Sequence, residues 1–557
     1  MDTRRTLFAA LTCVGLLFTT ACSNKGQTNA GFGVAISPQA MKAHLEFLAD
    51  DALEGRRTGT RGQELAAKYM AAQFAAVGLK GGMPDGSYYQ KVLLRRTEVI
   101  PESTSILLNG PGKAVKLRYS TDSLLLDTHQ AAKGTLSAPV VFVGYGVSAP
   151  EMNYDDYAGF DVKGKIVTLL FFEAPSKFPA PIRAYYMDND VKTQIAADHG
   201  AAGVLAIRTP QLEKKFPWQF MQRELTIGYN SMRWLDSQGR VHGLDARLAP
   251  SPMLNRSAAE ALFNGERYSL DDIFAAARKG ETPRFATNKT VTVQYESRHT
   301  PVESANVVAL IEGTDPALKS EYVVFSTHTD HLGIGPAVDG DTIYNGALDN
   351  ASGCAVLLEI ARAFCQLPAR PRRSVMFVAV TAEEQMLVGS DYFANNSPVS
   401  IEKVVADVNF DGPIPLQPSL RDVVAYGSEH SSLGQTATQA AAESGFAVSP
   451  DPRPDEGLFV RTDHYSFVKK GVPALFLNPG YSSGEPGLDA LNAQMQWSVT
   501  IYHSPKDEAS QKFDYPTGAR FARFAGLVGY KVAMQNERPS WNSGDFFGKR
   551  FAATSGK

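Results

Sequence analysis

The chain has 557 residues, of which 44% are hydrophobic and 20% charged, and its formal net charge at pH 7 is −3. This length exceeds what one hydrophobic core comfortably fills, so we expect a folded soluble protein with two domains. With no basic run and no positive net charge, the sequence gives no electrostatic basis for nucleic-acid binding.

The first 22 residues are typical of an export signal. The stretch MDTRRTLFAALTCVGLLFTTAC carries a basic pair, Arg4 and Arg5, and then an apolar run too short for a transmembrane helix. The small residues before Cys22 resemble a lipoprotein cleavage site, which would leave Cys22 as a lipidated first residue. A simple cleaved signal and a twin-arginine route are the alternatives. We expect an exported lipoprotein on the periplasmic side, and Ser23 favours the outer membrane.

Two cysteines remain in the body of the mature chain. Cys354 and Cys365 lie eleven positions apart on one predicted helix, or about 16 Å along its axis, which is too far for a disulfide bond. The sequence therefore predicts neither a disulfide framework nor a cysteine metal site.

Two helices follow a polar linker at residues 23–36. Ser37 and Pro38 are typical of a helix start, and apolar residues follow at helical spacing. A second amphipathic run, GQELAAKYMAAQFAAVG, ends at Gly78, which is placed to stop the helix. The segment between them, DALEGRRTGTRG, is expected to be a polar loop.

The predicted secondary structure changes twice after these helices. Residues 117–289 contain strand-like runs broken by Gly and Pro, such as APVVFVGYGV and GKIVTLLFF, and are expected to form a β-rich insert. Residues 37–116 would then be the N-terminal part of a main domain that continues at 290–557. In the latter range fully apolar strands alternate with helices, which predicts an α/β fold with a mostly parallel central sheet and helices on both faces.

Polar residues follow several of these predicted strands. The strand YVVF leads into His328 and Asp330, SVMFVAV leads into Glu383 and Glu384, and VVADVNF leads into Asp411. Ligand sites in such sheets form at the carboxyl ends of the strands. With Asp349 before a helix and His503 far along the chain, the set has two histidines, several carboxylates and no thiolate, which suits zinc or a similar divalent ion.

Each of these residues also has a structural alternative. A single loop histidine or aspartate is usually structural or solvated, and Asp349 could simply cap the following helix. Glu383 and Glu384 could form a solvated turn. Their recurrence at the ends of successive buried strands is what favours a metal site.

Six motifs carry a resemblance to a known family. STHTDHLG, NGALDNASG, VTAEEQMLVGS, VNFDG, RTDHYSF and YHSPKDE resemble, in order and spacing, the co-catalytic di-zinc aminopeptidase family (metallopeptidase family twenty-eight). That family also contains glutamate carboxypeptidase and glutaminyl cyclase. The resemblance covers residues 291–547 and the segment LADDALEGRRTGT. GYGVSAPEMNYDDYAGFDVKGKIV with HGAAGVLAIR resembles the protease-associated (PA) domain often inserted in such enzymes.

The resemblance implies a role for each site residue. His328 and Asp411 would hold one zinc ion, or another divalent metal, and Glu384 and His503 a second. Asp349 would bridge the two ions. The same motifs imply that Glu383 is the general base and that Asp330 fixes the ring of His328.

Other positions in the motifs are not family ligands. His331 is a candidate for substrate contact, and Asp463 and His464 match a recurrent motif whose role is mostly structural. The sequence departs from the family pattern at Leu348, Met386 and Gly412, which bears on the shape of the pocket rather than on the metals.

The expected function is that of a zinc-dependent exopeptidase, an aminopeptidase that hydrolyses N-terminal residues from peptides through a metal-bridging water and a glutamate base. The alternatives are a glutamate-carboxypeptidase-like enzyme, a glutaminyl cyclase, or a non-catalytic receptor-like protein of the same fold. The complete ligand set disfavours the receptor, and the second metal position disfavours the cyclase. A carboxypeptidase needs arginines near the site, where the sequence offers only Arg461. The sequence implies a peptide partner and a membrane link only through the lipid anchor, and leaves the oligomeric state open.

Overall fold

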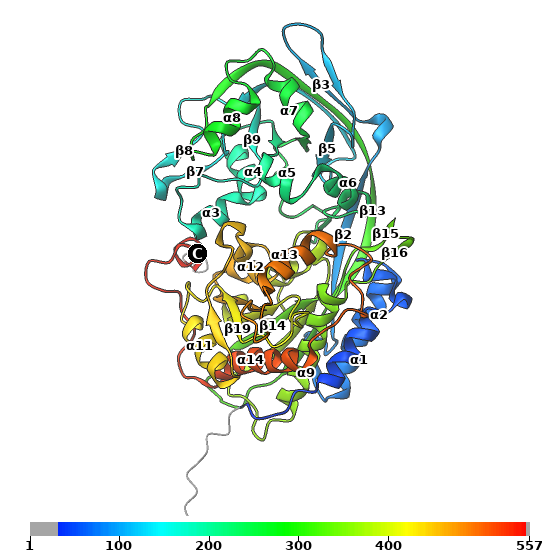
Figure 1. Ribbon diagram of the computed structural model, residues 1–557, viewed down its shortest axis with the longest axis vertical. Helices are drawn as coiled ribbons and strands as arrows, with labels where there is room; N and C mark the ends of the chain where they lie inside the picture. Colours follow the sequence, from blue (N-terminus) through cyan, green and yellow to red (C-terminus); the bar gives the residue numbers. More distant parts are fainter. Residues whose placement is uncertain (1–31, 553–557) are drawn as a thin grey trace, which may run out of the picture.

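The computed structural model describes residues 32–552. The predicted signal at 1–22, with Cys22, and the first part of the linker lie outside these residues, so export and lipidation stay predictions. Two lobes are stacked along the longest axis (Figure 1). The lower lobe comprises residues 32–99 and 297–552, and the upper lobe comprises residues 100–296, from which one segment reaches down to the lower sheet. In the described chain no helix is long and apolar enough to cross a membrane.

The lower lobe is built on one mixed sheet with the order β11-β2-β13-β17-β14-β18-β21-β19-β20. Its four central strands, β17, β14, β18 and β21, are parallel, which confirms the expected α/β class. The strands are β11 (Met232–Trp234), β2 (Tyr89–Val99), β13 (Phe285–Ile311), β17 (Ser374–Val380), β14 (Tyr322–His328), β18 (Val404–Phe410), β21 (Ala474–Pro479), β19 (Asp422–Tyr426) and β20 (Ala447–Ser449), with β1 (Lys80–Gly81) beside β13.

Helices cover both faces of this sheet because alternate strand residues point to opposite sides. Phe325 and Phe377 belong to the core on one face, whereas Val324 and Met376 belong to a separate cluster on the other. The first face carries α1 (Pro38–Leu48), α2 (Arg61–Ala76), α9 (Ser352–Cys365), α11 (Leu433–Glu443) and α14 (Tyr515–Met534), and the second carries α10 (Val388–Asn395) and α12 (His464–Val468). Also in this lobe are α13 (Ala490–Thr500), α15 (Phe546–Phe551), β15 (Gly333–Val338) and β16 (Asp341–Tyr344).

The upper lobe has its own sheet, with the order β4-β3-β13-β6-β9-β10-β12-β5. Its strands are β3 (Ser105–Asn109), β4 (Val115–Leu117), β5 (Ser123–Leu126), β6 (Lys133–Phe142), β9 (Ile166–Leu170), β10 (Gly203–Ile207) and β12 (Ser251–Leu254), with a hairpin of β7 (Ser148–Ala149) and β8 (Tyr154–Asp155). Its helices are α3 (Ala180–Met187), α4 (Asn189–Asp198), α5 (Pro210–Lys215), α6 (Trp218–Thr226), α7 (Arg256–Phe263) and α8 (Leu270–Ala277). The domain boundaries at 117 and 289, and the protease-associated character of this lobe, stay predictions.

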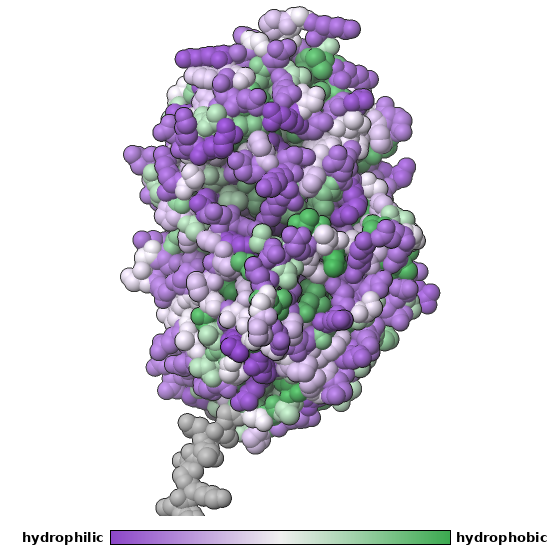
Figure 2. All heavy atoms as spheres, in the orientation of Figure 1, coloured by the Kyte–Doolittle hydropathy of each residue, from purple (hydrophilic) through white to green (hydrophobic). Residues whose placement is uncertain are grey.

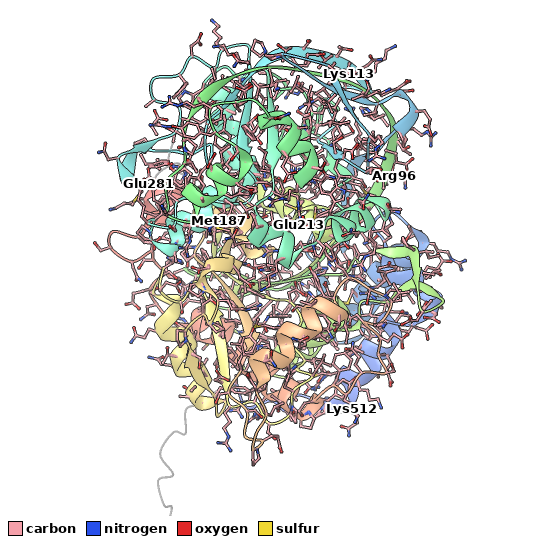
Figure 3. The ribbon with its side chains drawn as sticks, turned by 45° about the horizontal axis from the view of Figure 1, so that its top comes forward. Arg96, Lys113, Met187, Glu213, Glu281 and Lys512 are labelled. Carbon is pink, nitrogen blue, oxygen red and sulfur yellow. The ribbon has the colours of Figure 1, made fainter. Side chains whose placement is uncertain are left out.

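One strand joins the lobes. The first half of β13 pairs with β6 and β3 in the upper sheet, and its second half pairs with β2 and β17 in the lower sheet. Lys113 lies in the upper lobe and Lys512 in the lower lobe, toward opposite ends of the view in Figure 3. Hydrophilic residues cover most of the face in Figure 2, and the hydrophobic residues on it lie in small groups.

Several local predictions are confirmed. The Ser37 hydroxyl accepts a hydrogen bond from the amide of Ala40 (3.1 Å), which caps α1. Helix α2 ends at Ala76, and Gly78 follows with φ of +90°. Cys354 and Cys365 both lie on α9 and are free thiols.

The expected polar loop at 51–62 is different. Asp51–Arg56 forms a short 3-10 helix, and Arg56 is only 1% exposed. Its guanidinium donates to the carbonyls of Leu48, Thr329, Asn345 and Gly346. A buried guanidinium needs such acceptors, and here they tie the N-terminal helices to the two loops that follow β14 and precede α9.

We expect Arg56→Met to lower the free energy of unfolding by about 3 kcal/mol, because it leaves buried carbonyls without donors. Urea unfolding followed by circular dichroism measures this. The matched control is Arg61→Met, at an exposed position in the first turn of α2, which should change stability by less than about 0.5 kcal/mol. Equal stabilities for the two variants would contradict the role of Arg56.

Candidate metal centre

The five ligand residues named from the sequence come together above the carboxyl ends of the central strands. His328 is the last residue of β14, and Asp411 follows β18 directly. Asp349 lies in the turn before α9, and Glu384 lies in the 3-10 turn that follows β17. His503 follows α13 and reaches the cluster from a distant part of the sequence.

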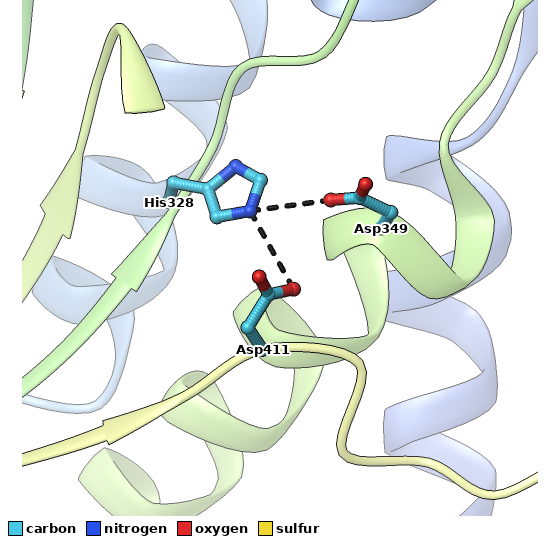
Figure 4. A group of neighbouring side chains, drawn as sticks. All are labelled: His328, Asp349 and Asp411. Atoms are coloured by element: carbon cyan, nitrogen blue, oxygen red, sulfur yellow. Dashed lines mark ion pairs between the residues drawn. The ribbon is translucent and has the colours of Figure 1, made fainter. Parts of the chain in front are cut away.

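The distances divide the cluster into two groups that share Asp349. His328 Nε2 lies 3.2 Å from Asp349 Oδ1 and 3.5 Å from an oxygen of Asp411 (Figure 4). His503 Nε2 lies 3.2 Å from Glu384 Oε2 and 3.5 Å from Asp349 Oδ2. Each Asp349 oxygen therefore faces a different histidine, as a bridging carboxylate would.

The hydrogen bonds of the two imidazoles leave Nε2 available in each. Nδ1 of His328 donates to the backbone carbonyl of Asp330 (3.1 Å), and Nδ1 of His503 donates to Glu224 (2.8 Å). Both Nε2 atoms are buried and make no hydrogen bond. Such a buried contact between imidazole nitrogens and carboxylate oxygens is favourable when a proton or a metal cation lies between them, so these residues fit divalent metal ions.

Burial and nearby charges shift the pKa values of the neighbouring residues Glu383 and Glu384 in opposite directions. Burial raises the pKa of Glu383 well above its usual value, and the Glu384 charge adds to this while His328 opposes it. Burial alone would also raise the pKa of Glu384, but His503 and His331 hold it at about 2. One carboxyl group is thus suited to take up a proton and the other to remain ionised, the separation that acid–base catalysis uses.

Asp330 supports the site in a different way from the one expected. Its carboxylate was expected to fix the His328 ring, but the nearest carboxylate oxygen lies 3.9 Å from Nδ1, and the backbone carbonyl is the closer contact. The carboxylate instead accepts hydrogen bonds from the amide of Glu383 (3.1 Å) and the hydroxyl of Thr58 (3.0 Å). Asp330 therefore holds the glutamate turn in place.

The loop that carries Asp349 has supports that the sequence did not indicate. The Asp507 carboxylate accepts the amides of Leu348 (2.9 Å) and Asp349 (3.0 Å). Gly346, with φ of +63°, approaches the Asp349 carbonyl and the His331 ring so closely that a Cβ atom would clash with both. Asp507 lies within the motif YHSPKDE, which was the one available signal for it.

Three other residues of the motifs, His331, Asp463 and His464, are buried in or near the cluster. Nδ1 of His331 lies 2.7 Å from Glu384 Oε1 and 3.9 Å from Asp349 Oδ2, so His331 could also face an ion held by these two carboxylates. Asp463 is buried, and burial raises its pKa to about 7. Burial lowers the pKa of His464 to about 3, and its Nδ1 hydrogen-bonds Thr462.

A cleft of about 260 Å3 opens beside the cluster, and Asp349, Glu383 and Asp411 line it. Its other walls contain apolar residues and three basic ones, not the single arginine that the sequence led us to expect. Lys215 is the last residue of α5 in the upper lobe, the helix on which Figure 3 labels Glu213. The basic residues are Lys215, Arg453 and Arg461.

Two of these basic residues are partly neutralised. Lys215 lies 2.9 Å and Arg453 3.3 Å from carboxylate oxygens of Glu456. Arg461 stacks over the ring of Phe172 at 5.3 Å and forms no ion pair with any residue of the described chain. The cleft thus has an acidic end at the ligand cluster and residual positive charge elsewhere on its wall.

Residues 306–528 match the model of peptidase family M28. The match contains all five ligand residues and Glu383.

Curated relatives are similar to this chain over part of their length. "Probable glutamate carboxypeptidase LAMP1" from Arabidopsis thaliana is 27% identical over 244 residues, covering 40% of this chain and 31% of the relative. "Aminopeptidase NAALADL1" from Mus musculus is 34% identical over 133 residues, covering 23% and 16%. This chain thus spans about a third or less of the length of these two relatives. The solved aminopeptidase from Aneurinibacillus sp. strain AM-1 has the same fold, with a TM-score of 0.51 and 19% identity over 90% of this chain and 96% of that one.

We expect Asp330→Asn to weaken retention of divalent ions about 10- to 100-fold, because an amide nitrogen would face a donor in the glutamate turn. Dialysis against graded chelator followed by elemental analysis measures this. The control is Asp339→Asn, which changes a side chain that is 78% exposed and should leave ion binding normal. Normal ion retention in Asp330→Asn would show that the turn does not need this carboxylate.

Proposed function

We propose that the protein is a zinc metallopeptidase, an aminopeptidase that removes single residues from the free N-terminus of short peptides. The observation that carries this proposal is the pair of His–carboxylate groups that share Asp349, with Glu383 beside them. The match of residues 306–528 to the model of peptidase family M28 supports it, as do relatives named as aminopeptidases.

The ligand set would hold two zinc ions. His328 and Asp411 would bind one ion, Glu384 and His503 the other, and Asp349 both. When bound, such ions act as Lewis acids that activate water and polarise the scissile carbonyl group.

Glu383 would perform the proton transfers. An Oε atom of Glu383 accepts a proton from the attacking water and delivers it to the nitrogen of the leaving amine as the C–N bond breaks. The pKa of Glu383, raised by burial, suits a group that must both accept and return a proton. His328 lies 4.0 Å from this carboxyl group, so the base stands directly beside the proposed ligands.

We expect Glu383→Gln to retain about two zinc ions per chain but to lose about a thousandfold in kcat, because only proton transfer is removed. Elemental analysis and peptide hydrolysis assays measure the two effects, and a chelator should abolish the wild-type activity. Glu46→Gln, in an exposed pair with Lys42, serves as the control. Turnover of the Glu383 variant at the wild-type rate would exclude this residue as the base.

The charge of the cleft bears on which end of a peptide is cut. With two ions bound, the carboxylates of Asp349, Glu384 and Asp411 would be compensated, and the ions would offer a binding position to a free α-amine. Arg461 favours a second candidate, a carboxypeptidase of the glutamate carboxypeptidase type, because an unpaired guanidinium can hold a terminal carboxylate. The aminopeptidase is preferred because the proposed ions would lie at the reacting centre beside Glu383, whereas Arg461 stacks on Phe172.

We expect N-acetylation of a good tripeptide substrate to lower kcat/KM by at least about tenfold, the effect of losing about 1.4 kcal/mol of binding. C-terminal amidation should change kcat/KM by less than about threefold. Parallel assays on the free, acetylated and amidated forms of one sequence make the comparison. If amidation causes the larger loss, the carboxypeptidase assignment replaces the aminopeptidase one.

A further inference from the structure

One segment of the upper-lobe sequence reaches the metal centre. Residues 218–234 comprise α6, a turn and β11, and we call them the bridging segment. Strand β11 pairs antiparallel with β2, for example Met232 with Arg96, so the segment ends as the edge strand of the lower sheet. A part of the chain expected to fold within a separate insert is therefore anchored to the lobe that carries the ligands.

Glu224 on α6 is hydrogen-bonded to a proposed ligand, His503, and the ring of Tyr229 in the same segment lies 6.1 Å from the His503 ring. Glu224 is 2% exposed, and its Oε2 accepts the hydrogen bond from Nδ1 of His503 at 2.8 Å. Its other oxygen makes no hydrogen bond, and the nearest cation is Arg223, at 3.6 Å. A glutamate is seldom buried this deeply without a partner, and His503 is the closest partner that the described residues provide.

The same segment also holds the turn that carries Glu384. The side-chain oxygen of Gln385, the next residue, accepts the backbone amides of Ser231 (2.8 Å) and Met232 (3.1 Å). Arg233 donates to the backbone carbonyl of Gln385 at 3.3 Å. His503 and Glu384, the two residues proposed to hold one ion with Asp349, are thus both supported from the bridging segment.

The other histidine has a different support. Nδ1 of His328 donates to the backbone carbonyl of Asp330, which lies within the lower lobe. A carboxylate is a stronger acceptor than a neutral carbonyl, and it makes the metal-binding nitrogen of the ring more basic. The two proposed ion positions therefore differ in their dependence on the upper lobe.

We propose that Glu224 is a positioning residue for His503, through which the upper lobe completes the ion position formed by His503 and Glu384. This inference rests on the proposed function, because it requires two bound ions. Glu224 orients the ring through Nδ1 and adds negative charge behind it. The ion position of His328 and Asp411 does not need this contact.

Stepwise zinc titration of the metal-free protein against a chromophoric chelator tests the proposal, because it gives a separate dissociation constant for each ion. Glu224→Ala should weaken one constant about 10- to 100-fold and leave the other unchanged. Glu224→Gln keeps an acceptor without the charge, so its effect should be smaller. His503→Ala identifies which constant belongs to this position, and the same constant must change in the Glu224 variants.

Glu260→Gln is the matched control, because Glu260 is an exposed glutamate of the same lobe, paired with Arg256 at 2.8 Å. It should bind both ions like the wild type. Unchanged constants in both Glu224 variants would overturn the proposal. So would a parallel loss of both constants together with a lower thermal midpoint of the metal-free variant, which would indicate a purely structural role. A wild-type protein that binds fewer than two ions would overturn the proposed function as well.

Discussion

The position of one buried carboxylate, that of Asp349, governs the rest of the site. Its two oxygens face two histidines that come from the end of β14 and from the region after α13, far apart in the sequence. Asp349 faces both histidines at once because contacts to its backbone and to the residues before it hold this turn in place. Asp507 accepts the amide of Asp349, Arg56 binds the preceding carbonyls, and Gly346 allows the close approach.

Gathering acids in a buried place is unfavourable unless hydrogen bonds or cations compensate each charge. Asp330 and Asp507 are both buried acids near the ligands, and each accepts backbone amides rather than binding a basic side chain. Their negative charge is thus used to fix two turns, those of Glu383 and Asp349. The candidate ligand carboxylates face histidine rings instead: Glu384 lies 2.7 Å from Nδ1 of His331, and Asp349 and Asp411 lie 3.2 and 3.5 Å from Nε2 of His328, an arrangement that suits divalent cations.

The clustering of the candidate ligands could be predicted from the sequence because most of them lie at the ends of apolar strands. His328 ends one strand, and Glu384 and Asp411 follow two others; the apolar sequence of each strand indicates that it is buried, and parallel strands bring their ends to one edge. The supports could not be predicted in this way. Arg56 appears in a polar stretch that is typical of a loop, and only the folded chain shows that four carbonyls converge on it.

The charge of the cleft could not be predicted from the sequence either. Lys215 and Arg453 lie in segments without any catalytic motif, more than two hundred positions apart, and they meet only because both contact Glu456. The spacing of residues in the sequence does not indicate tertiary contacts of this kind between the two lobes. It does carry information on the fold class, because strand burial and helix periodicity are read within each segment.

The two lobes also share a hydrophobic core, which limits how independently they can move. Phe142 and Phe263 of the upper lobe belong to the same cluster as Tyr426, Phe459 and Phe547 of the lower lobe. Because this packing, the continuous strand β13 and the pairing of β11 with β2 all cross the boundary, relative motion of the lobes would have to break several contacts at once. The cleft is therefore best regarded as largely pre-formed, with its walls set by the packing between the lobes rather than by closure around a peptide.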